Sequence, residues 1–326
     1  MRQRYPGLRT SRKRHGRKKH IHAICPKTIG VRDESGAVPD ASHICGVAAM
    51  REWCAVFPLR CHTIASLRFC ILCQGGSMER IGHLLKKTRT RTFDEGNFRG
   101  HTDYLIESDP GARPAPQAFL VHQSPGWVLP PHFHLEEQFQ VITGGSGSLG
   151  KHAVAPITVH YTSRETGYGP LVAGTEGLDY LSLRAVTDPG AWYMPESRDK
   201  MRRGLRKWQT TLGPIDVNNP DLRSSTTHST EVLLPIDEDG LAVWLLRLPA
   251  HARAVAPLQQ RGGGRFHVVV GGALVRAGDA LGYASCVWRD PSDAELEVCA
   301  GPAGLALLVL QFPAQALEIE PRQMDV

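Results

Sequence analysis

The chain has 326 residues, which is enough for two domains that each bury a core of their own. Charged residues make up 21% and apolar residues 41%, with 33 Gly and 23 Pro, so the composition favours a soluble, turn-rich protein and argues against a long-helix one. No apolar run is long enough to span a bilayer, and we therefore expect no membrane partner.

The net charge of +6 comes from the first part of the chain. Residues 1–77 hold 14 Lys and Arg against 4 Asp and Glu, and nine of the basic residues lie between Arg2 and Lys19. Arg51, Arg60 and Arg68 interrupt every stretch that would otherwise resemble a secretory signal. The segment has no sustained period of 2 or 3.6, which predicts a disordered or poorly packed basic, cysteine-containing extension upstream of a natural start at Met78. A transit peptide or a nucleic-acid-binding tail is the alternative.

Six of the eight cysteines lie in this extension, where Cys70 and Cys73 have C-x-x-C spacing. No second pair completes a zinc site. The later two, Cys286 and Cys299, occur in apolar, strand-like runs, so we interpret them as buried thiols in a reducing compartment. A cytoplasmic location is the prediction.

Two segments of the remaining chain repeat at one fixed offset. Residues 138–145 (QFQVITGG) align with 265–272 (RFHVVVGG), and residues 172–183 align with 299–310, in both cases without gaps and 127 residues apart. Two ungapped matches at the same offset are hard to obtain by chance, so the sequence predicts a duplicated domain.

Short apolar runs alternate with Gly, Pro and Asp turns in both copies, which is typical of a β-sandwich or barrel. The expected strands are residues 118–122, 138–143, 157–161 and 178–184 in the first copy, and 232–236, 241–248, 266–270, 285–288 and 305–312 in the second. Asp237–Gly240 is a hairpin-type turn signal. The G-x-G-x-x-G at Gly145–Gly150 is interpreted as a hairpin too, because a strand and not a helix follows it.

The expected organisation is an N-terminal barrel at residues 97–187, a linker at 188–230 and a C-terminal barrel at 231–325. The linker carries six basic residues between Arg198 and Lys207. These form a solvated face or, as the alternative, an anion-attracting rim.

The motif with the clearest chemistry runs from Gly126 to Gly145. His132 and His134 are two positions apart, so on a strand both side chains turn to the same face, and Gln138 follows in the same phase. Two neutral imidazoles that converge on one point suit a divalent transition metal ion, namely Fe, Mn, Ni, Cu or Zn.

This stretch resembles the first motif of the cupin superfamily, G-x5-H-x-H-x3,4-E-x6-G. Gln138 stands where the family has its glutamate, so either Glu136 or a bulged Glu137 would have to supply the missing negative charge. Residues 97–325 as a whole resemble a bacterial group of bicupins without an assigned reaction. The resemblance implies an all-β fold of two tandem cupin barrels, of the double-stranded β-helix or jelly-roll type, and a homodimer formed through edge strands.

The second cupin motif is not matched, since residues 158–171 have strand, turn and strand character but no H-x3-N. His160, Tyr168 and water remain open as the fourth ligand. His122 lies on the preceding strand and either faces the cavity or is a rim residue.

When the two copies are aligned at the offset of 127, the second copy has none of the expected metal ligands. His132, His134, Gln138 and His160 map onto Gln259, Arg261, Arg265 and Val287. The C-terminal barrel is therefore expected to be degenerate, with a structural role or, alternatively, an anion pocket.

These patterns favour a bicupin metal-binding protein, expected to be a metal-dependent enzyme of dioxygenase, isomerase or lyase type that acts on a small oxygen-bearing molecule. The alternative is a non-catalytic small-molecule-binding or sensor cupin, because the glutamate and the second-motif histidine are missing. Nucleic-acid binding through the basic extension is disfavoured, since no helix-turn-helix pattern follows it.

Overall fold

The computed structural model describes residues 79–94, 96–108, 115–217 and 227–317. The predictions for residues 1–77, for Met78 and for the Cys70 and Cys73 pair lie outside these ranges. Within them the chain forms strands and three single 3-10 turns, and no helix is long and apolar enough to cross a membrane. The turns are η1 (Leu84–Lys86), η2 (Arg198–Lys200) and η4 (Ala314–Leu317).

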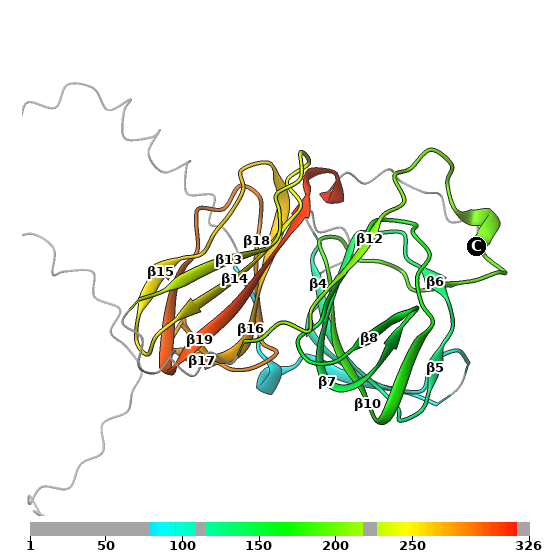
Figure 1. The fold of residues 1–326 in the computed structure, drawn as a ribbon, viewed down its shortest axis with the longest axis horizontal. Coiled ribbons are helices and arrows are strands. Elements are labelled where there is room, and N and C mark those ends of the chain that lie inside the picture. The colour runs from blue at the N-terminus through cyan, green and yellow to red at the C-terminus, as the bar shows by residue number, and fades with distance from the viewer. Residues whose placement is uncertain (1–78, 95, 109–114, 218–226, 318–326) are drawn as a thin grey trace, which may run out of the picture. The chain divides into compact units, whose positions relative to one another are not determined.

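The first copy is an antiparallel sheet with the strand order β12-β9-β7-β10-β4-β3-β2, to which β5 and β8 attach through β10 and β7. Figure 1 shows these strands, cyan to green, curled into a barrel. The strands are β2 (Arg89–Phe93), β3 (Gly100–Ile106), β4 (Gln117–Gln123), β5 (Val128–Leu129), β6 (His132–Phe133), β7 (Gln138–Leu149), β8 (His152–Val154), β9 (Val159–Thr162), β10 (Leu171–Arg184), β11 (Trp192–Tyr193) and β12 (Gln209–Leu212).

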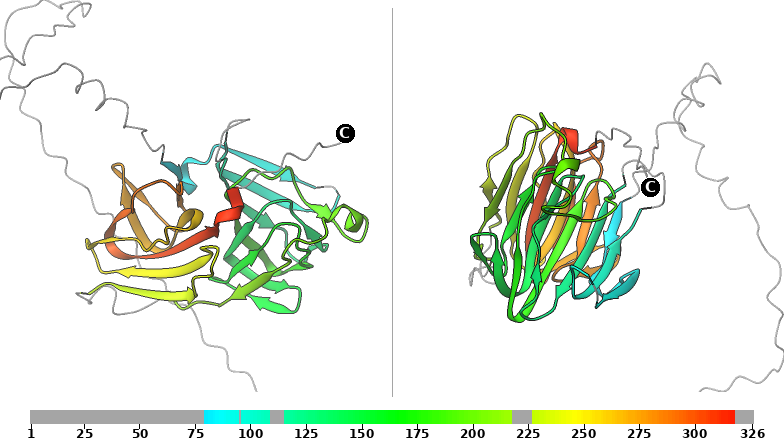
Figure 2. Two further views of the ribbon diagram at one scale, coloured as in Figure 1. Left: turned by 90° about the horizontal axis from the view of Figure 1, so that it is seen from above. Right: turned by 90° about the vertical axis from the view of Figure 1, so that its right-hand side faces the viewer.

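The second copy repeats this arrangement with the order β1-β18-β16-β19-β14-β13. Its strands are β1 (Arg80–Gly82), β13 (Ser229–Leu234), β14 (Ala242–Leu248), β15 (Arg253–Val255), β16 (Gly262–Arg276), β17 (Asp279–Leu281), β18 (Cys286–Arg289) and β19 (Glu297–Pro313). Although β1 precedes the first barrel in the chain, it pairs with β18, and Figure 2 shows this cyan segment beside the second copy.

All nine strands expected from the apolar runs are present, at β4, β7, β9 and β10 and at β13, β14, β16, β18 and β19. Asp237–Gly240 forms the predicted turn, in which the Gly240 N–H donates to the Asp237 carbonyl at 2.9 Å. Gly145–Gly150 lies in the β7–β8 hairpin, as expected, where Leu149 pairs with His152. The missed strands are two to seven residues long, which leaves little periodicity to detect.

The described part of residues 188–230, expected as a linker, contributes two strands to the first barrel and the first two residues of β13 to the second. β11 pairs with β6, and β12 extends the sheet beside β9. The segment therefore covers one edge of the first barrel, next to the residues of the predicted metal site.

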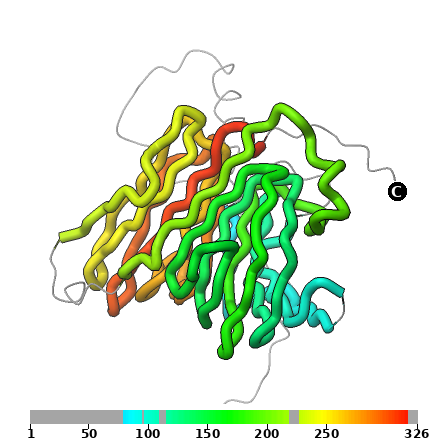
Figure 3. Tube along the Cα trace, turned by 45° about the vertical axis from the view of Figure 1, so that its right-hand side comes forward, coloured from blue at the N-terminus to red at the C-terminus, as the bar shows by residue number. Residues whose placement is uncertain are grey.

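The pairing register confirms the duplication. Ser182 lies opposite Gln140 in the first copy, and Val309 lies opposite His267 in the second, each 127 residues later. The two long strand pairs, β7–β10 and β16–β19, even share a bulge at the equivalent position. Figure 3 shows these long antiparallel pairs as adjacent tubes.

Two glycine pairs explain why Gly recurs at the same offset. Gly145 and Gly272 have φ of +67° and +64°, and Gly177 and Gly304 both have +82°. A Cβ on Gly145 or Gly272 would lie about 2 Å from the carbonyl oxygen of the partner glycine, at 2.1 and 2.0 Å. Only glycine fits a left-handed backbone that approaches another strand so closely.

The main core forms where the outward faces of the two copies pack against each other. Phe139, Val141 and Leu181 of the first copy join Phe266 and Leu308 of the second in one buried cluster. Smaller clusters fill the interiors of the two barrels. Two tandem antiparallel barrels with an all-β fold are therefore confirmed for the described residues.

The two late cysteines are free thiols, but the expected burial holds only for Cys286 and is wrong for Cys299. Cys286 is fully buried, and burial raises the pKa of its thiol to about 12. Cys299 is only half-buried, because its position on β19 lies toward the open edge formed with the short strand β15.

Candidate metal centre

The interior of the first barrel becomes polar where β7, β9 and β10 lie side by side. Strand alternation sends their apolar side chains outward into the shared core and their polar side chains inward. All members of the inward set are buried: Gln138, Gln140, His160, Thr162, Ser182 and Arg184. The predicted site residues thus face a common interior.

His132 is held by its backbone and by both ring nitrogens. Its N–H and carbonyl exchange hydrogen bonds with Tyr168, at 3.1 and 3.0 Å. Nδ1 lies 2.8 Å from the Pro130 carbonyl, and Nε2 lies 3.0 Å from the Tyr168 hydroxyl. A carbonyl can only accept, so Nδ1 carries the proton and the Nε2 lone pair faces inward. Burial, and then the neighbouring His134, lower the pKa of His132 to about 3.

His134 has the same tautomer, fixed by a carboxylate. Its Nδ1 lies 2.8 Å from Asp188 Oδ1 and 3.1 Å from the Gly190 carbonyl. Burial and the charge of Arg184 lower the pKa of His134. Burial alone would raise the pKa of Asp188, but its interaction with the His134 ring, including the hydrogen bond, outweighs burial and lowers that pKa to about 2. Both imidazoles are therefore neutral, with Nε2 free of a proton.

The rings of His132 and His134 lie edge to face with their centroids 5.3 Å apart, and only 2% and 7% of the two residues are exposed. Gln138 joins them through Tyr168, because its Nε2 donates to the Tyr168 hydroxyl at 2.8 Å. Its Oε1 accepts from Arg184. Burial raises the pKa of Tyr168, so its phenol stays protonated and donates to His132.

His160 stands beside this network without joining it. Its ring centroid is 5.4 Å from that of Tyr168. Nδ1 lies 3.0 Å from the Thr211 hydroxyl, and Nε2 lies 2.8 Å from the Thr162 hydroxyl. The structure thus brings together His132, His134, Gln138 and Tyr168, while His160 has a hydroxyl partner at each nitrogen.

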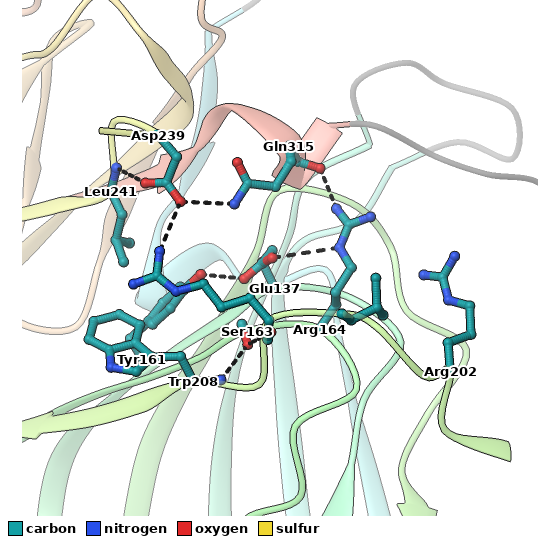
Figure 4. A pocket seen from close by; sticks show the side chains of 11 residues that line it. Glu137, Tyr161, Ser163, Arg164, Arg202, Trp208, Asp239, Leu241 and Gln315 are labelled. Atoms are coloured by element: carbon teal, nitrogen blue, oxygen red, sulfur yellow. Dashed lines mark hydrogen bonds and ion pairs between the residues drawn. The ribbon is translucent and has the colours of Figure 1, made fainter. Parts of the chain in front are cut away.

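Glu137, considered above as a bulged replacement for the missing glutamate, points away from the imidazoles. Its carboxylate accepts from the Tyr161 hydroxyl and lies 3.6 Å from Arg164 Nε, in the pocket drawn in Figure 4. This pocket has a volume of about 240 Å³ and is lined by residues of both copies. Glu136 is half-buried, and burial raises its pKa to about 7.

Two residues of the site were not expected from the sequence. Arg184 Nη2 lies 3.2 Å from His134 Nε2, on the side that the imidazoles face. The alternation of Leu181, Ser182, Leu183 and Arg184 is a signal that could have placed this guanidinium inside. Asp188 had no such signal, because it lies beyond the end of β10, in the segment expected to be a linker.

The donor set fits a divalent transition metal ion in part. The two Nε2 atoms are neutral donors, and oxygen acceptors behind the rings hold their orientation, as in histidine-metal sites generally. In the described part of the chain no carboxylate contacts the two Nε2 atoms, and the guanidinium of Arg184 adds positive charge. An ion at this position would therefore be stabilised by an anionic ligand that balances its charge.

The equivalent part of the second barrel lacks the imidazole pair, which Gln259 and Arg261 replace. Arg265, which replaces Gln138, donates to the backbone carbonyls of Asp290, Asp293 and Ala294 at 3.0 to 3.4 Å. Its guanidinium thus fastens the loop after β18 and has few donors left for an anion.

No family model matches the sequence, and no curated protein is similar to it. Several solved structures are similar to the chain at low sequence identity. An oxalate decarboxylase from Lactobacillus farciminis is 12% identical over 72% of this chain and 86% of that one, with a TM-score of 0.47. Salicylate 1,2-dioxygenase from Pseudoaminobacter salicylatoxidans is 12% identical over 76% and 85%, with a TM-score of 0.47. Procruciferin, an 11S globulin from Brassica napus, is 11% identical over 72% and 85%, with a TM-score of 0.49.

The strand order, the register of the repeat and the position of the H-x-H motif inside the first barrel agree with the resemblance found in the sequence. The chain has a bicupin-like fold.

Proposed function

We propose that the first barrel binds a divalent transition metal ion through His132 and His134 and presents it to a small anionic, oxygen-bearing ligand, in a metal-dependent enzyme of oxidoreductase, isomerase or lyase type. The observation that carries the proposal is the shared tautomer of the two imidazoles. Both Nδ1 protons go to oxygen atoms behind the rings, so both Nε2 lone pairs face the barrel interior.

Arg184 defines the class of ligand. Its guanidinium faces the same interior point as the imidazoles. A metal ion bound there would be repelled by this positive charge. A carboxylate or a similar oxyanion resolves both charges, since it pairs with the guanidinium in a bidentate manner and also donates an oxygen to the ion.

When bound, such an ion would polarise a ligand oxygen or, if it is iron, activate dioxygen. The chain's own residues bind and orient the ligand. Gln138 holds the Arg184 guanidinium in place, and the Tyr168 hydroxyl donates to His132 Nε2 at the same point. Ile142, Leu171 and Tyr180 form an apolar wall beyond the polar layer and exclude water.

The test is the metal content of the purified full chain, measured by elemental analysis after incubation with each candidate metal and gel filtration. We expect about one equivalent that depends on His132, with loss of at least tenfold in affinity in His132→Ala and again in His134→Ala. His152→Ala removes an exposed histidine of the same barrel and should retain the parent metal content. Equal metal content in the parent and in both site variants would contradict the proposal.

A metal-free anion binder or sensor is the second candidate, and one observation favours it. Arg184, Gln138, Tyr168 and His132 already form a continuous chain of hydrogen bonds that occupies the His132 Nε2 lone pair, while the buried Arg184 Nε has no acceptor among the described residues. In that case a small carboxylate should bind without metal, and His132→Ala with His134→Ala should leave its affinity within a factor of about three. Calorimetric titration of chelator-treated protein separates the two functions.

A further inference from the structure

A second group of possible metal ligands lies on the outer face of the first barrel, away from the His132 pocket. His101 and Asp103 of β3 and His122 of β4 place three ligand atoms within 4.8 Å of one another. The residues share the face of their strands that carries Leu105 and Leu120 of the main core, but they lie at the edge of that core. The His122 side chain is 24% exposed, so the group can be reached from solvent.

The orientation of His122 is fixed from the next strand. Its Nδ1 lies 2.9 Å from Asp179 Oδ1 on β10, directly opposite it in the sheet. A carboxylate accepts, so Nδ1 carries a proton and Nε2 is left as the possible ligand. This is the arrangement that Asp188 imposes on His134, now on the other side of the sheet.

The Nε2 atom of His122 is buried and has no hydrogen-bond partner among the described residues. It lies 3.7 Å from Asp103 Oδ2, which is too far for a hydrogen bond. A lone pair beside a carboxylate oxygen is unfavourable unless a cation lies between them. The ring of His101 stacks on that of His122 at 4.1 Å and brings a third ligand to the same place.

One basic side chain now occupies part of this position. Lys87 Nζ donates to Asp103 Oδ2 at 2.7 Å. Its side chain is 43% exposed, whereas that of Asp103 is 8% exposed, so the lysine is the member that can swing out into solvent. The ammonium group compensates the buried carboxylate as a metal ion would, and the two cations compete for it.

We propose that His101, Asp103 and His122 form a second site for a divalent transition metal ion of the zinc class, with Asp179 as the residue that positions His122. Two imidazoles and one carboxylate are a ligand set that zinc accepts, with water as the fourth ligand. Ligands of a tetrahedral zinc ion lie about 3.3 Å apart, so side-chain rotations suffice to close the site. Such an ion would tie β3 to β4 near the edge of the sheet.

The experiment is a calorimetric titration of chelator-treated full chain with zinc chloride. The parent and His101→Ala/His122→Ala are compared in the His132→Ala/His134→Ala background, so that failure of the barrel site does not affect the result. We expect the double variant to bind one equivalent less than its parent. Lys87→Met, in the same background, should bind zinc roughly tenfold more tightly, because it removes the competing charge.

A control variant, His83→Ala/His152→Ala, removes two histidines of the described chain that lie outside the group and should bind as many equivalents as the parent. Circular dichroism before and after titration checks that each variant is folded. Unchanged stoichiometry in His101→Ala/His122→Ala, or unchanged affinity in Lys87→Met, would overturn the proposal. Metal content of the His132 pocket is measured separately and bears only on the proposed function.

Discussion

The two copies of the repeat share their outward faces and differ in their interiors. Facing the common core, Phe139 and Leu181 of the first copy correspond to Phe266 and Leu308 of the second. Facing inward, the polar residues of the first copy are replaced: Gln138 by Arg265, His160 by Val287, Tyr180 by Leu307, Ser182 by Val309 and Arg184 by Gln311.

This difference shows that the outward faces and the interiors of the two barrels are under different physical constraints. The outward faces must pack against each other, so an apolar set is required in both copies. The interior of each barrel is free to differ, since the strand ladders do not depend on it. A polar interior costs stability where its groups lack hydrogen bonds. The network of the first copy bonds Gln138, Tyr168 and His132, although Arg184 Nε has no partner among the described residues. The second copy replaces His160 and Ser182 by valines but keeps the buried His267, whose ring nitrogens also lack a partner there.

The largest effects should come from the shared faces. Phe139→Ala and Phe266→Ala each remove a fully buried ring, and both rings lie close to Phe312, at 4.9 and 6.2 Å. We expect each change to lower the free energy of unfolding by about 3–5 kcal/mol, measured by urea denaturation. Val275→Ala, at a 40% exposed position, should cost less than about 0.5 kcal/mol. A loss below 1 kcal/mol in either Phe variant would show that the two faces are not equivalent.

An effect of pH on stability should also be measurable for the interior of the second barrel. His267 is fully buried, and burial, together with the charge of Arg265, lowers its pKa to about 3. Above pH 6.5 the imidazole is neutral in both the folded and unfolded states, so its contribution to stability is complete. As the pH falls from about 6.5 toward 3, only the unfolded chain takes up the proton, and the free energy of unfolding decreases.

His267→Leu should therefore reduce the loss of stability between pH 7 and pH 4, by up to about 3 kcal/mol. Urea denaturation at the two pH values measures it. His152→Leu, at an exposed position, should leave the difference as it is in the parent. The prediction fails if His267→Leu and the parent lose the same stability on acidification.

The fold was predictable because the repeat and the strand periods are properties of the sequence. The nine apolar runs gave the long strands, and the offset of 127 gave the register that the structure shows. The short strands β5, β6, β8 and β11 were missed because two or three residues carry no measurable period. The placement of β1 in the second barrel depends on a long-range pairing to which no local pattern points.

The candidate site was predictable only in part. The spacing of His132 and His134 indicated a common face, and the structure brings Gln138 and Tyr168 to the same place. Arg184 and Asp188 come from the end of β10 and beyond, so their approach to the histidines follows from barrel closure. Whether His160 or Tyr168 lies closer to His132 also depends on strand order, since the two residues are on different segments.

A smaller loss of stability is expected from a change at Tyr161, where the two copies have different aromatic hydrogen-bond donors. Tyr161 donates its hydroxyl to the buried Glu137, and Trp288, its equivalent, donates its ring N–H to Asp290. Burial raises the pKa of Glu137, and the bond from Tyr161 partly offsets this. Tyr161→Phe should lower the free energy of unfolding by about 1–3 kcal/mol, because a buried carboxylate loses its partner.

Glu137→Gln in the Tyr161→Phe background should recover part of that loss, since a neutral amide costs less to bury than an unpaired carboxylate. Urea denaturation of the two single variants, the double variant and the parent gives the coupling energy. Additive losses in the double variant would mean that the hydroxyl and the carboxylate are not coupled.

The smallest expected effect is a change in ligand affinity in Arg184→Gln. This substitution compares the two interiors directly, because it gives the first copy the residue that the second copy has at Gln311. Removing the guanidinium, which lies 3.2 Å from His134 Nε2, should raise the affinity for a divalent metal ion roughly tenfold and weaken the binding of small carboxylates. Calorimetric titration with metal alone, and then with acetate or oxalate, measures both. Arg91→Gln, on the exposed edge strand β2, is the control and should change neither. If Arg184→Gln leaves the metal affinity unchanged, the charge of this arginine does not act on the imidazole pair, and the metal-free reading of the pocket gains support.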